Sequence, residues 1–236
     1  MALWRADLHV HTVLSGCAEV EMIPRLLIER CRQQGLHVLG VVDHNSAGNA
    51  EAAMAAARGS GVVVKPGLEV ESRETVHLLC LFDEAPQAQS LQSLVYAHLP
   101  SSAPAASVQA FGPQMLVDSS GAFLRYEERP LFTATDLPAA EIARAARDCH
   151  GLVLAAHAER RAHGLLGVLG FPPPDLELDG MEAGPGRLAA GRVASSDAHR
   201  LSEIGSRYTV FESDGVTVEQ LRKMLASGAF RTGVTL

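Results

Sequence analysis

The sequence predicts an α/β fold built around a parallel sheet, and two observations support this. Short apolar runs rich in Val and Leu alternate along the chain with amphipathic or Ala-rich segments of helical length. Such alternation is typical of βαβ units, in which each helix crosses back over the sheet. Roughly seven units fit the chain, and this number favours a closed barrel over an open doubly wound sheet, which we keep as the alternative.

The predicted strands are short and apolar, and several contain β-branched residues, which pack well on a pleated surface. They lie at 3–10, 36–42, 62–65, 75–82, 151–156, 176–182, 191–195 and 208–211. The predicted helices lie at 23–34, 49–58, 87–98, 137–150 and 217–227. In the first of these helices, Pro24 near the start and Gly35 just after the end are typical boundary residues.

An insertion interrupts the alternation at about 100–129. Its first part, 100–113, is rich in Pro, Ser and Ala and is predicted to be a loop. Two alternating runs, 114–117 and 122–126, then flank Asp118-Ser119-Ser120-Gly121 and predict a hairpin. No linker or repeat divides the chain, so we expect a single domain over residues 1–236 that carries this insertion.

Composition limits the partners that we expect. The formal net charge of −7 argues against a surface that coats nucleic acid, because such a surface needs a basic stripe to displace counterions. The widely spaced cysteines form no CxxC pair, which fits a reducing compartment. The N-terminus lacks an apolar signal segment, and no apolar run approaches the roughly 18 residues of a membrane span. We therefore expect a soluble, cytoplasmic protein with no membrane partner, and the sequence carries no signal of oligomeric state.

Strong metal-ligand residues fall where the predicted strands end. Loops that follow the strands of a βα barrel share one face, so residues far apart in the sequence converge there. In extended backbone, side chains two residues apart lie on the same side, which lets an HxH pair hold one ion. The residues in this position are His9, His11, Asp43, His44, Glu69, His157, Asp197 and His199, and His77 lies within the strand predicted at 75–82.

Each of these motifs alone also fits an ordinary surface or core residue. Their recurrence at strand ends favours a cluster, and burying so many titratable groups together without a cation would be costly. The remaining histidines are predicted to be structural, with His163 the nearest of them to the cluster. These structural histidines are His37, His98, His150 and His163.

The segments that carry these residues resemble those of a known family. DLHVHT, VVDHN, PGLEVES, VHLLCLF, AAHAERR and SSDAH are similar, in this order, to motifs of the PHP (polymerase and histidinol phosphatase) family of metal-dependent phosphoesterases. The resemblance runs from Asp7 to about Phe211. It implies a distorted (β/α)7, TIM-like barrel with two or three divalent ions at the C-terminal ends of the strands.

The resemblance also implies a ligand set. One ion would take His9, His11, Glu69 and Asp197, and Glu69 would bridge to a second ion on His77 and His157. A third ion would take His44, His199 and one ligand soon after the HxH pair. Many members carry His or Asp there, whereas this chain reads Ser15-Gly16-Cys17; Cys17 is the predicted ligand, with Glu19 or Glu21 as alternatives. Asp43 is predicted to orient an imidazole.

This ligand set predicts a reaction. Imidazole and carboxylate suit zinc, manganese or iron, and a His-rich cluster of divalent ions attracts phosphate. A hydroxide bridging two ions would attack phosphorus, and Arg160 would bind the phosphate, with Arg161 and Arg200 as weaker candidates. Asp197 or His199 would protonate the leaving group.

The expected substrate is a small phosphorylated molecule, whose identity the sequence leaves open. Histidinol phosphate, nucleotides, cyclic diesters and oligonucleotide ends all fit, and no extended nucleic-acid surface is expected. The insertion is the expected specificity element. Packing explains its aromatic residues, Phe111, Phe123 and Tyr126, at least as well as base stacking does.

Two alternatives remain. An amidohydrolase also begins with HxH but usually bridges its metals with a carboxylated lysine, whereas Glu69 stands at the bridging place here and Lys65 falls inside a predicted strand. The second alternative is a non-catalytic metal-binding module, because PHP domains also occur as accessory domains of DNA polymerases.

Overall fold

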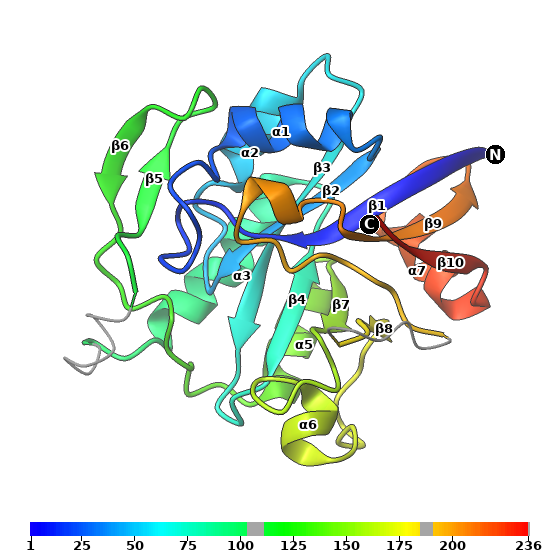
Figure 1. The fold of residues 1–236 in the computed structure, drawn as a ribbon. Coiled ribbons are helices and arrows are strands. Elements are labelled where there is room, and N and C mark those ends of the chain that lie inside the picture. The colour runs from blue at the N-terminus through cyan, green and yellow to red at the C-terminus, as the bar shows by residue number, and fades with distance from the viewer. Residues whose placement is uncertain (103–110, 185–190, 236) are drawn as a thin grey trace.

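The computed structural model describes residues 1–102, 111–184 and 191–235, and its centre is a curled sheet of eight strands (Figure 1). The strands of this sheet are β1 Ala2–Val10, β2 Val38–His44, β3 Val63–Glu71, β4 His77–Leu81, β7 Leu152–Ala155, β8 Gly180–Met181, β9 Arg207–Ser213 and β10 Phe230–Val234. Their order across the sheet is β10-β9-β1-β2-β3-β4-β7-β8.

The sheet is mixed. β1, β2 and β3 run parallel to one another, as do β7 and β8. β4 runs antiparallel to both of its neighbours, and β9 runs antiparallel to β1 and β10. A βα barrel has parallel neighbours throughout, so the α/β class holds, while the predicted count of seven βα units is not confirmed.

Helices cover the sheet, and their bounds are α1 Pro24–Gln33, α2 Ala50–Ala57, α3 Ala85–Ala97, α5 Ala139–Asp148, α6 Leu165–Leu169 and α7 Val218–Ser227, with a 3-10 turn at Leu201–Glu203. One apolar cluster lies between α1, α2 and the strands β1 to β3, and another between α3, α5 and the strands β3, β4 and β7. A third cluster joins α7 to residues such as Leu79 and Leu154 on the other face of the sheet. Both faces of the central strands are therefore buried, which explains their almost continuous apolar sequences.

The segment 193–198 links β8, at one edge of the curled sheet, to β1, the third strand from the other edge. Val193 forms a parallel bridge with Glu182, directly after β8, and Ala198 forms one with Val10 at the end of β1. Backbone hydrogen bonds reinforce both links: Val193 N donates to Met181 O, and His11 N donates to Ala198 O. The segment predicted as a strand at 191–195 is thus extended, but within its described part it makes isolated bridges instead of a ladder.

Most predicted elements are present with shifted ends. The largest shift is in β3, which was predicted at 62–65 but continues through Pro66 and Gly67 to Glu71, so that Glu69 lies within a strand and not after it. The strand predicted at 176–182 shrinks to Gly180–Met181. Elements that the pattern does not predict are α6, the 3-10 turn and β10.

The insertion forms the predicted hairpin. Strands β5, Met115–Val117, and β6, Phe123–Tyr126, pair antiparallel and stand apart from the central sheet (Figure 1). Asp118 accepts hydrogen bonds from the backbone of Ser120 and Ala122 and so closes the turn. The predicted loop at 100–113 falls partly outside the described residues, because 103–110 are not described. Among the described helices, none is long and apolar enough to cross a bilayer. The single-domain organisation stays a prediction.

Candidate metal centre

The predicted site residues meet around one buried carboxylate. Glu69, near the end of β3, is fully shielded from solvent, and each of its oxygen atoms faces imidazole nitrogens. The nitrogens of five histidines lie within 3.4 Å of it: His77 Nδ1 at 2.8 Å, His44 Nδ1 at 3.0 Å, His157 Nε2 at 3.2 Å, and His9 Nε2 and His11 Nε2 at 3.4 Å. Residues from β1, β2, β4 and the loop after β7 thus converge on one residue of β3.

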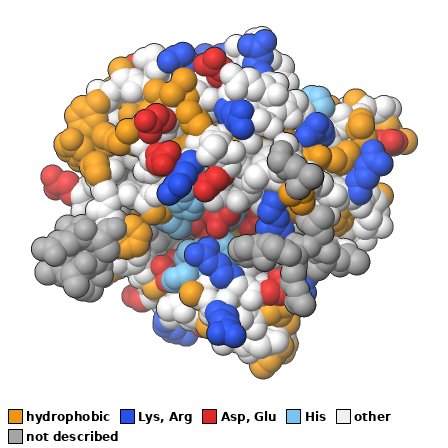
Figure 2. All heavy atoms as spheres, viewed as in Figure 1, with side chains coloured by type: hydrophobic (Ala, Val, Ile, Leu, Met, Phe, Trp, Pro, Cys, Tyr) orange, Lys and Arg blue, Asp and Glu red, His pale blue; other side chains and the backbone are white. Residues whose placement is uncertain are grey.

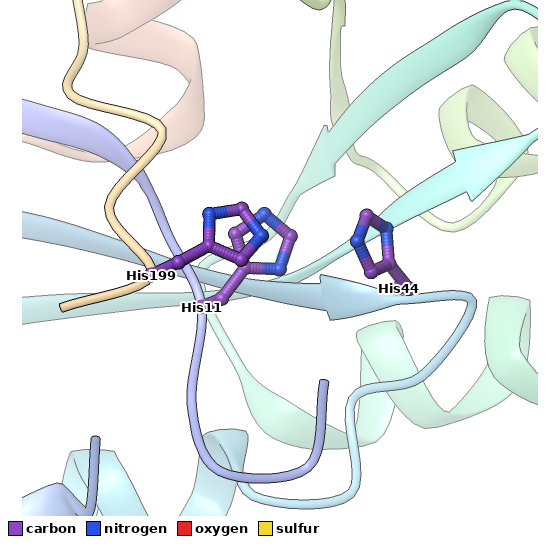
Figure 3. Close-up of side chains that lie close together, drawn as sticks. All are labelled: His11, His44 and His199. Carbon is purple, nitrogen blue, oxygen red and sulfur yellow. The ribbon is translucent and has the colours of Figure 1, made fainter. Parts of the chain in front are cut away.

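Asp197, within the segment 193–198, and His199, just after it, approach the same cluster. Asp197 Oδ1 lies 3.3 Å from His9 Nε2 and 3.4 Å from His11 Nε2. The His199 ring stacks on the His11 ring with centroids 4.1 Å apart, and His44 lies beside them (Figure 3). Potential ligand atoms of His11, His44 and His199 lie within 4.8 Å of one another.

Other hydrogen bonds set the orientation of these rings. Glu182, which no sequence motif singled out, accepts from His9 Nδ1 at 3.1 Å and from the backbone N of His157 at 2.9 Å. His199 Nδ1 lies 2.9 Å from the carbonyl oxygen of Asp197. A carboxylate or carbonyl can only accept, so both Nδ1 atoms carry the proton, and both Nε2 atoms are left to face the cluster. Glu182 is the last residue of the strand predicted at 176–182, so the strand-end signal that identified the other residues could also have found it.

Asp43 orients an imidazole, although it does so through a serine. Ser15 Oγ donates to Asp43 Oδ1 at 2.7 Å and lies 2.9 Å from His11 Nδ1. Because its only proton goes to Asp43, Ser15 accepts from His11 Nδ1–H. Thr12 also donates to Asp43, through both its backbone N and its hydroxyl. The carboxylate therefore holds the loop that follows β1 as well as the ring.

The gap between His9 and His11 requires a positive charge. Their Nε2 atoms lie 3.1 Å apart, and the partners of both Nδ1 atoms leave a lone pair on each Nε2. Two lone pairs at this distance repel each other unless a proton or a metal ion lies between or beside them. In addition, His157 Nδ1 is buried without a hydrogen-bond partner. The donor set therefore fits divalent cations.

The pKa values agree with a cluster held together by opposite charges. Burial alone would raise the pKa of the Glu69 carboxyl, but the charges of His77 and His9 outweigh burial and hold that pKa well below its usual value. Burial would lower the pKa of His9, yet Asp197 and Glu69 raise it well above the ordinary value. Burial, with His199 and His44 nearby, lowers the pKa of His11.

Cys17 lies in the pocket with His44 and His199. Partial burial would raise the pKa of its thiol, but hydrogen bonds with His199 and His44 outweigh this and lower the pKa to about 6. The alternatives lie elsewhere: Glu19 is half-exposed and pairs with Arg200 at 3.2 Å, and Glu21 is exposed. The backbone N of Glu19 does donate to His199 O at 2.9 Å, but the Glu19 side chain pairs with Arg200, so Cys17 is the side chain that lies in the pocket with the two histidines.

Glu71 and His163 extend the cluster beyond the predicted set. His163 Nδ1 lies 3.3 Å from Glu71 Oε1, and its ring stacks on His77 with centroids 4.4 Å apart. His163 was predicted to be structural, but it lines the same pocket as His77. Glu71 stands two residues after Glu69 in β3, so strand periodicity directs both side chains to one face. The other predicted structural histidines, His37, His98 and His150, do not line this pocket.

The pocket itself is small and almost wholly ionisable. It has a volume of about 220 Å³ and contains Arg160 at its mouth, where the guanidinium lies 3.3 Å from Asp197 Oδ2. Figure 2 shows histidine side chains at the floor of this hollow and basic side chains around its edge. Arg161 does not line it, and Arg200 is held by Glu19 on the outside.

Backbone strain accompanies the site. His157 and Asp197 have positive φ angles of 30° and 55°, and His163 has one of 65°. Residues with a Cβ atom rarely adopt this region, and such strain tends to persist where surrounding contacts require one side-chain direction. At His157 and Asp197 the strained backbone directs the side chains toward Glu69 and the HxH pair.

Solved structures with the same fold include the lesion-specific endonuclease Q of Pyrococcus furiosus, with a TM-score of 0.68, 20% sequence identity and 98% of this chain covered. An endonuclease Q complex with a 27-mer duplex, which carries an abasic lesion at the active site, matches with a TM-score of 0.69 and 20% identity, again over 98% of this chain. This chain spans 58% of the length of those endonuclease chains.

Two further structures match over nearly their whole length. A protein from Bifidobacterium adolescentis, assigned as a metal-dependent phosphoesterase, has a TM-score of 0.55 and 20% identity, with 98% of this chain and 97% of that chain covered. An amidohydrolase from Chromobacterium violaceum has a TM-score of 0.58 and 17% identity, with 96% and 97% covered. At these identities the matches establish the fold.

The endonuclease Q complex corrects one sequence prediction. The sequence predicts a small phosphorylated substrate and, from the net charge of −7, no extended nucleic-acid surface. This expectation is wrong as an exclusion, because a protein of this fold binds a DNA duplex. Net charge describes the whole surface, whereas bound cations set the field inside a pocket and can make it positive in an acidic protein.

Family models match two parts of the chain. The PHP domain model matches residues 7–150, and a PHP-associated model matches residues 190–230. Among curated proteins, none matches this sequence. The family, the similar structures and the buried His/Glu clusters together indicate a metal-dependent hydrolase. Because the first match covers more than half of the chain, this protein belongs to the PHP domain family.

Proposed function

We propose that this protein hydrolyses a phosphoester with the help of two or three divalent metal ions. The observation that carries the proposal is the cluster of imidazole nitrogens around the buried Glu69, with His9 Nε2 and His11 Nε2 only 3.1 Å apart. Such a donor set is satisfied by protons or by metal ions, and its mixture of imidazole and carboxylate ligands suits divalent cations. Zinc, manganese and iron are the ions whose ligand preferences match it.

The ligand roles are part of the proposal. His9, His11, Glu69 and Asp197 would hold one ion, and Glu69 would share a second with His77 and His157. His44, His199 and Cys17 would hold a third, which the pocket accommodates because all three residues line or adjoin it. Glu182, Ser15 and Asp43 would keep the rings in place, because each contacts a ring or its holder and not the open side of the cluster.

Phosphate suits this pocket better than an uncharged ester or amide does. The positive charge of two or three divalent ions would exceed the negative charge of Glu69 and Asp197, so the pocket would attract an anionic group. Arg160 at the mouth adds a planar fork of donors that matches phosphoryl oxygens. The phosphoryl group of the substrate would therefore lie between Arg160 and the histidine cluster.

The protein residues divide the remaining work. Bound divalent cations supply Lewis acidity, which polarises a phosphoryl oxygen and lowers the pKa of water. Arg160 would orient the phosphoryl group and stabilise the charge that develops on its equatorial oxygens. Asp197 or His199, both at the open side of the cluster, would donate a proton to the departing oxygen. The buried position of Glu69 and His9 keeps bulk water away from the inner side.

Amide hydrolysis is the second candidate, because an amidohydrolase shares the fold. A carboxylated lysine would have to reach the cluster, but Lys65 Nζ lies 2.6 Å from Asp83 Oδ1, and Asp83 also accepts from the backbone N of Val218 at the start of α7. In the proposed ligand set, Glu69 would take the place of that lysine between the ions. These contacts favour a phosphoester over an amide.

A substrate panel tests the proposal directly. The purified protein, reconstituted with Mn²⁺, Zn²⁺ or Fe²⁺, is offered an aryl phosphate monoester, an aryl phosphate diester, a 5′-phosphorylated oligonucleotide and a cyclic amide. We expect hydrolysis of at least one phosphoester, loss of that activity with a chelator, and no turnover of the amide. Hydrolysis of the amide alone would transfer the proposal to the amidohydrolase class, and a metal-loaded protein inert toward all four would favour a non-catalytic module.

Glu69→Gln should disrupt the cluster at its centre. The amide cannot supply the negative charge that two ions share, so we expect bound metal to fall to about one ion or fewer per chain. Loss of an outer partner of a metal ligand typically costs roughly 10–100-fold, and loss of this ligand should lower kcat/KM by more than that. Elemental analysis and steady-state kinetics measure both, with Glu141→Gln on the exposed face of α5 as the matched control. Undiminished turnover in Glu69→Gln would contradict the bridging role.

Cys17→Ala should lower the occupancy of the proposed third metal site only. The lowered thiol pKa makes a thiolate ligand available at neutral pH, so its loss should reduce metal content by up to about one ion per chain and leave the other ions bound. Cys149→Ala, at a partly exposed cysteine outside the pocket, is the control. Unchanged metal content in Cys17→Ala would show that another residue completes this ligand set.

Arg160→Ala should weaken the handling of phosphate. A hydrogen bond to a charged group contributes roughly 1.5–3 kcal/mol, so kcat/KM should fall by about 10- to 100-fold while metal content stays the same. Arg161→Ala removes the same charge from the next residue, which is exposed and does not line the pocket. An equal loss in both variants, measured by the same kinetics, would assign the effect to general surface charge.

A further inference from the structure

Two phenylalanine rings lie in the same pocket as the candidate ligands. Phe111 and Phe132 stack with ring centroids 4.3 Å apart and an angle of 8° between their planes. Both line the pocket that contains His44, His199 and Arg160, whose other described lining residues have ionisable side chains. The pair therefore supplies the apolar surface of an otherwise charged pocket, beside the place proposed for the phosphoryl group.

The loops that carry the candidate ligands also hold these two rings. Gly112 N donates to Gly16 O at 2.7 Å, so Phe111 is tied to the residue before Cys17. A Cβ atom on Gly16 would collide with the carbonyl group of Gly112, which explains why both positions of this contact are glycine. Phe132 is held from the other side of the pocket.

Asn45 fixes Phe132 through the backbone on both of its sides. Its side-chain amide donates to Leu131 O at 2.8 Å and to Thr133 O at 2.9 Å. Asn45 follows His44 directly and has a positive φ angle of 50°, a conformation that Asn tolerates better than most residues. The positions of both rings are thus coupled to residues adjoining Cys17 and His44, as expected of a binding element and not of loose surface packing.

A second hollow continues from the pair toward the hairpin. It has a volume of about 540 Å³ and is lined by both Phe111 and Phe132, and farther along by Tyr126. Tyr126 is 57% exposed, and its ring lies 4.7 Å from that of Phe123, which is 51% exposed. Figure 2 shows the apolar patch over the β5–β6 hairpin that these side chains form with Leu124. Two aromatic pairs therefore follow one path away from the metal centre.

The charges along this path nearly balance. Arg129 lies 2.9 Å and Arg125 3.6 Å from Glu127, and Glu128 adjoins them. The path is therefore no basic stripe, and a ligand on it would be held mainly by its planar faces. Proteins that bind single-stranded nucleic acid combine positive charge with aromatic side chains on which bases stack. Here the path offers the stacking surfaces, and the positive charge would come from the metal centre and Arg160.

Resting on the proposed phosphoesterase function, we propose that the stacked pair of Phe111 and Phe132 offers an outer ring face to the base of the nucleotide whose phosphate would lie at the metal centre, with one ring contacting the base and the other supporting it. Phe123 and Tyr126 bind a further base of the same single strand. The substrate class is thus a single-stranded nucleic acid, or a strand end, held by stacking and anchored by one phosphate. The acidic net charge is compatible with this mode, because few phosphates are contacted.

The test measures binding and not turnover, so that it is independent of the proposed reaction. A fluorescently labelled ten-nucleotide single strand with phosphorothioate linkages, which resist hydrolysis, is titrated with the metal-loaded protein, and anisotropy gives Kd. We expect Phe111→Ala and Phe132→Ala each to weaken binding by about tenfold, the usual scale for one lost base stack. Phe171→Ala removes a phenylalanine that is 64% exposed and lies outside both hollows, and it should not change Kd.

Three comparisons separate stacking from other modes. Replacing the terminal base of the strand by an abasic unit should weaken its binding to the wild-type protein. The same replacement should abolish most of the difference in Kd between the wild type and Phe132→Ala. Tyr126→Ala should weaken the ten-nucleotide strand but not a mononucleotide. Raising the salt concentration from 50 to 200 mM should change Kd by less than about tenfold, whereas a protein with 6–10 phosphate contacts would lose roughly 10³- to 10⁵-fold.

The contrary results are equally specific. Variants of Phe111 and Phe132 that bind like the wild type, or that lose as much affinity for the abasic strand as for the normal one, would overturn the stacking role. A mononucleotide that binds as tightly as the strand would overturn the role of Phe123 and Tyr126. A protein that binds the strand as described but hydrolyses no phosphoester would retain this inference and refute the proposed reaction.

Discussion

One buried carboxylate is the constraint on which this structure depends. Glu69 is fully shielded from water, and a lone ionised carboxylate in that position would be strongly disfavoured. It is tolerated because imidazoles from β1, β2, β4 and the loop after β7 surround it at 2.8–3.4 Å. The strands that supply those imidazoles must therefore end at the same height around β3. Any fold of this chain that separated them would leave an unpaired charge in the interior.

A surrounding layer of hydrogen bonds fixes the orientation of the side chains in this cluster. Three acceptors each receive a hydrogen bond from the Nδ1–H of one histidine, and this turns the Nε2 atom of that ring inward. The pairs are Glu182 with His9, Ser15 with His11, and the carbonyl group of Asp197 with His199. Asp7 accepts hydrogen bonds from Ser196 N and Gly205 N, and so binds the segment that carries Asp197 and His199 against β1. Positive φ angles at His157 and Asp197 show that backbone strain is tolerated to keep these directions.

The sequence predicted the members of the cluster better than it predicted the framework. Recurrence of His, Asp and Glu at strand ends is a local signal, and the structure brings all of the predicted ligand positions together. Glu71 and His163 escaped notice because each has an ordinary structural explanation until β3 is seen to extend through Pro66. The antiparallel pairing of β4, and the bridging role of 193–198, depend on contacts between distant segments. The hydrophobic pattern of a strand buried on both faces is nearly the same in parallel and antiparallel pairing. It could therefore not reveal the direction of β4 or the bridges made by 193–198.

Net charge misled for a related reason: it averages over a surface, while recognition here depends on two local features. The first is a set of donors that requires cations and so makes an acidic protein locally attractive to phosphate. The second is a pair of rings whose backbone is held by Gly16 and Asn45, each next to a candidate ligand. A shift of Cys17 or His44 on metal binding would be transmitted to Phe111 through the Gly112–Gly16 hydrogen bond and to Phe132 through the two hydrogen bonds of Asn45. If the proposed third ion and the proposed base both bind, they would therefore be mechanically linked, because a nucleotide that stacks on the rings would favour the loop positions of Cys17 and His44.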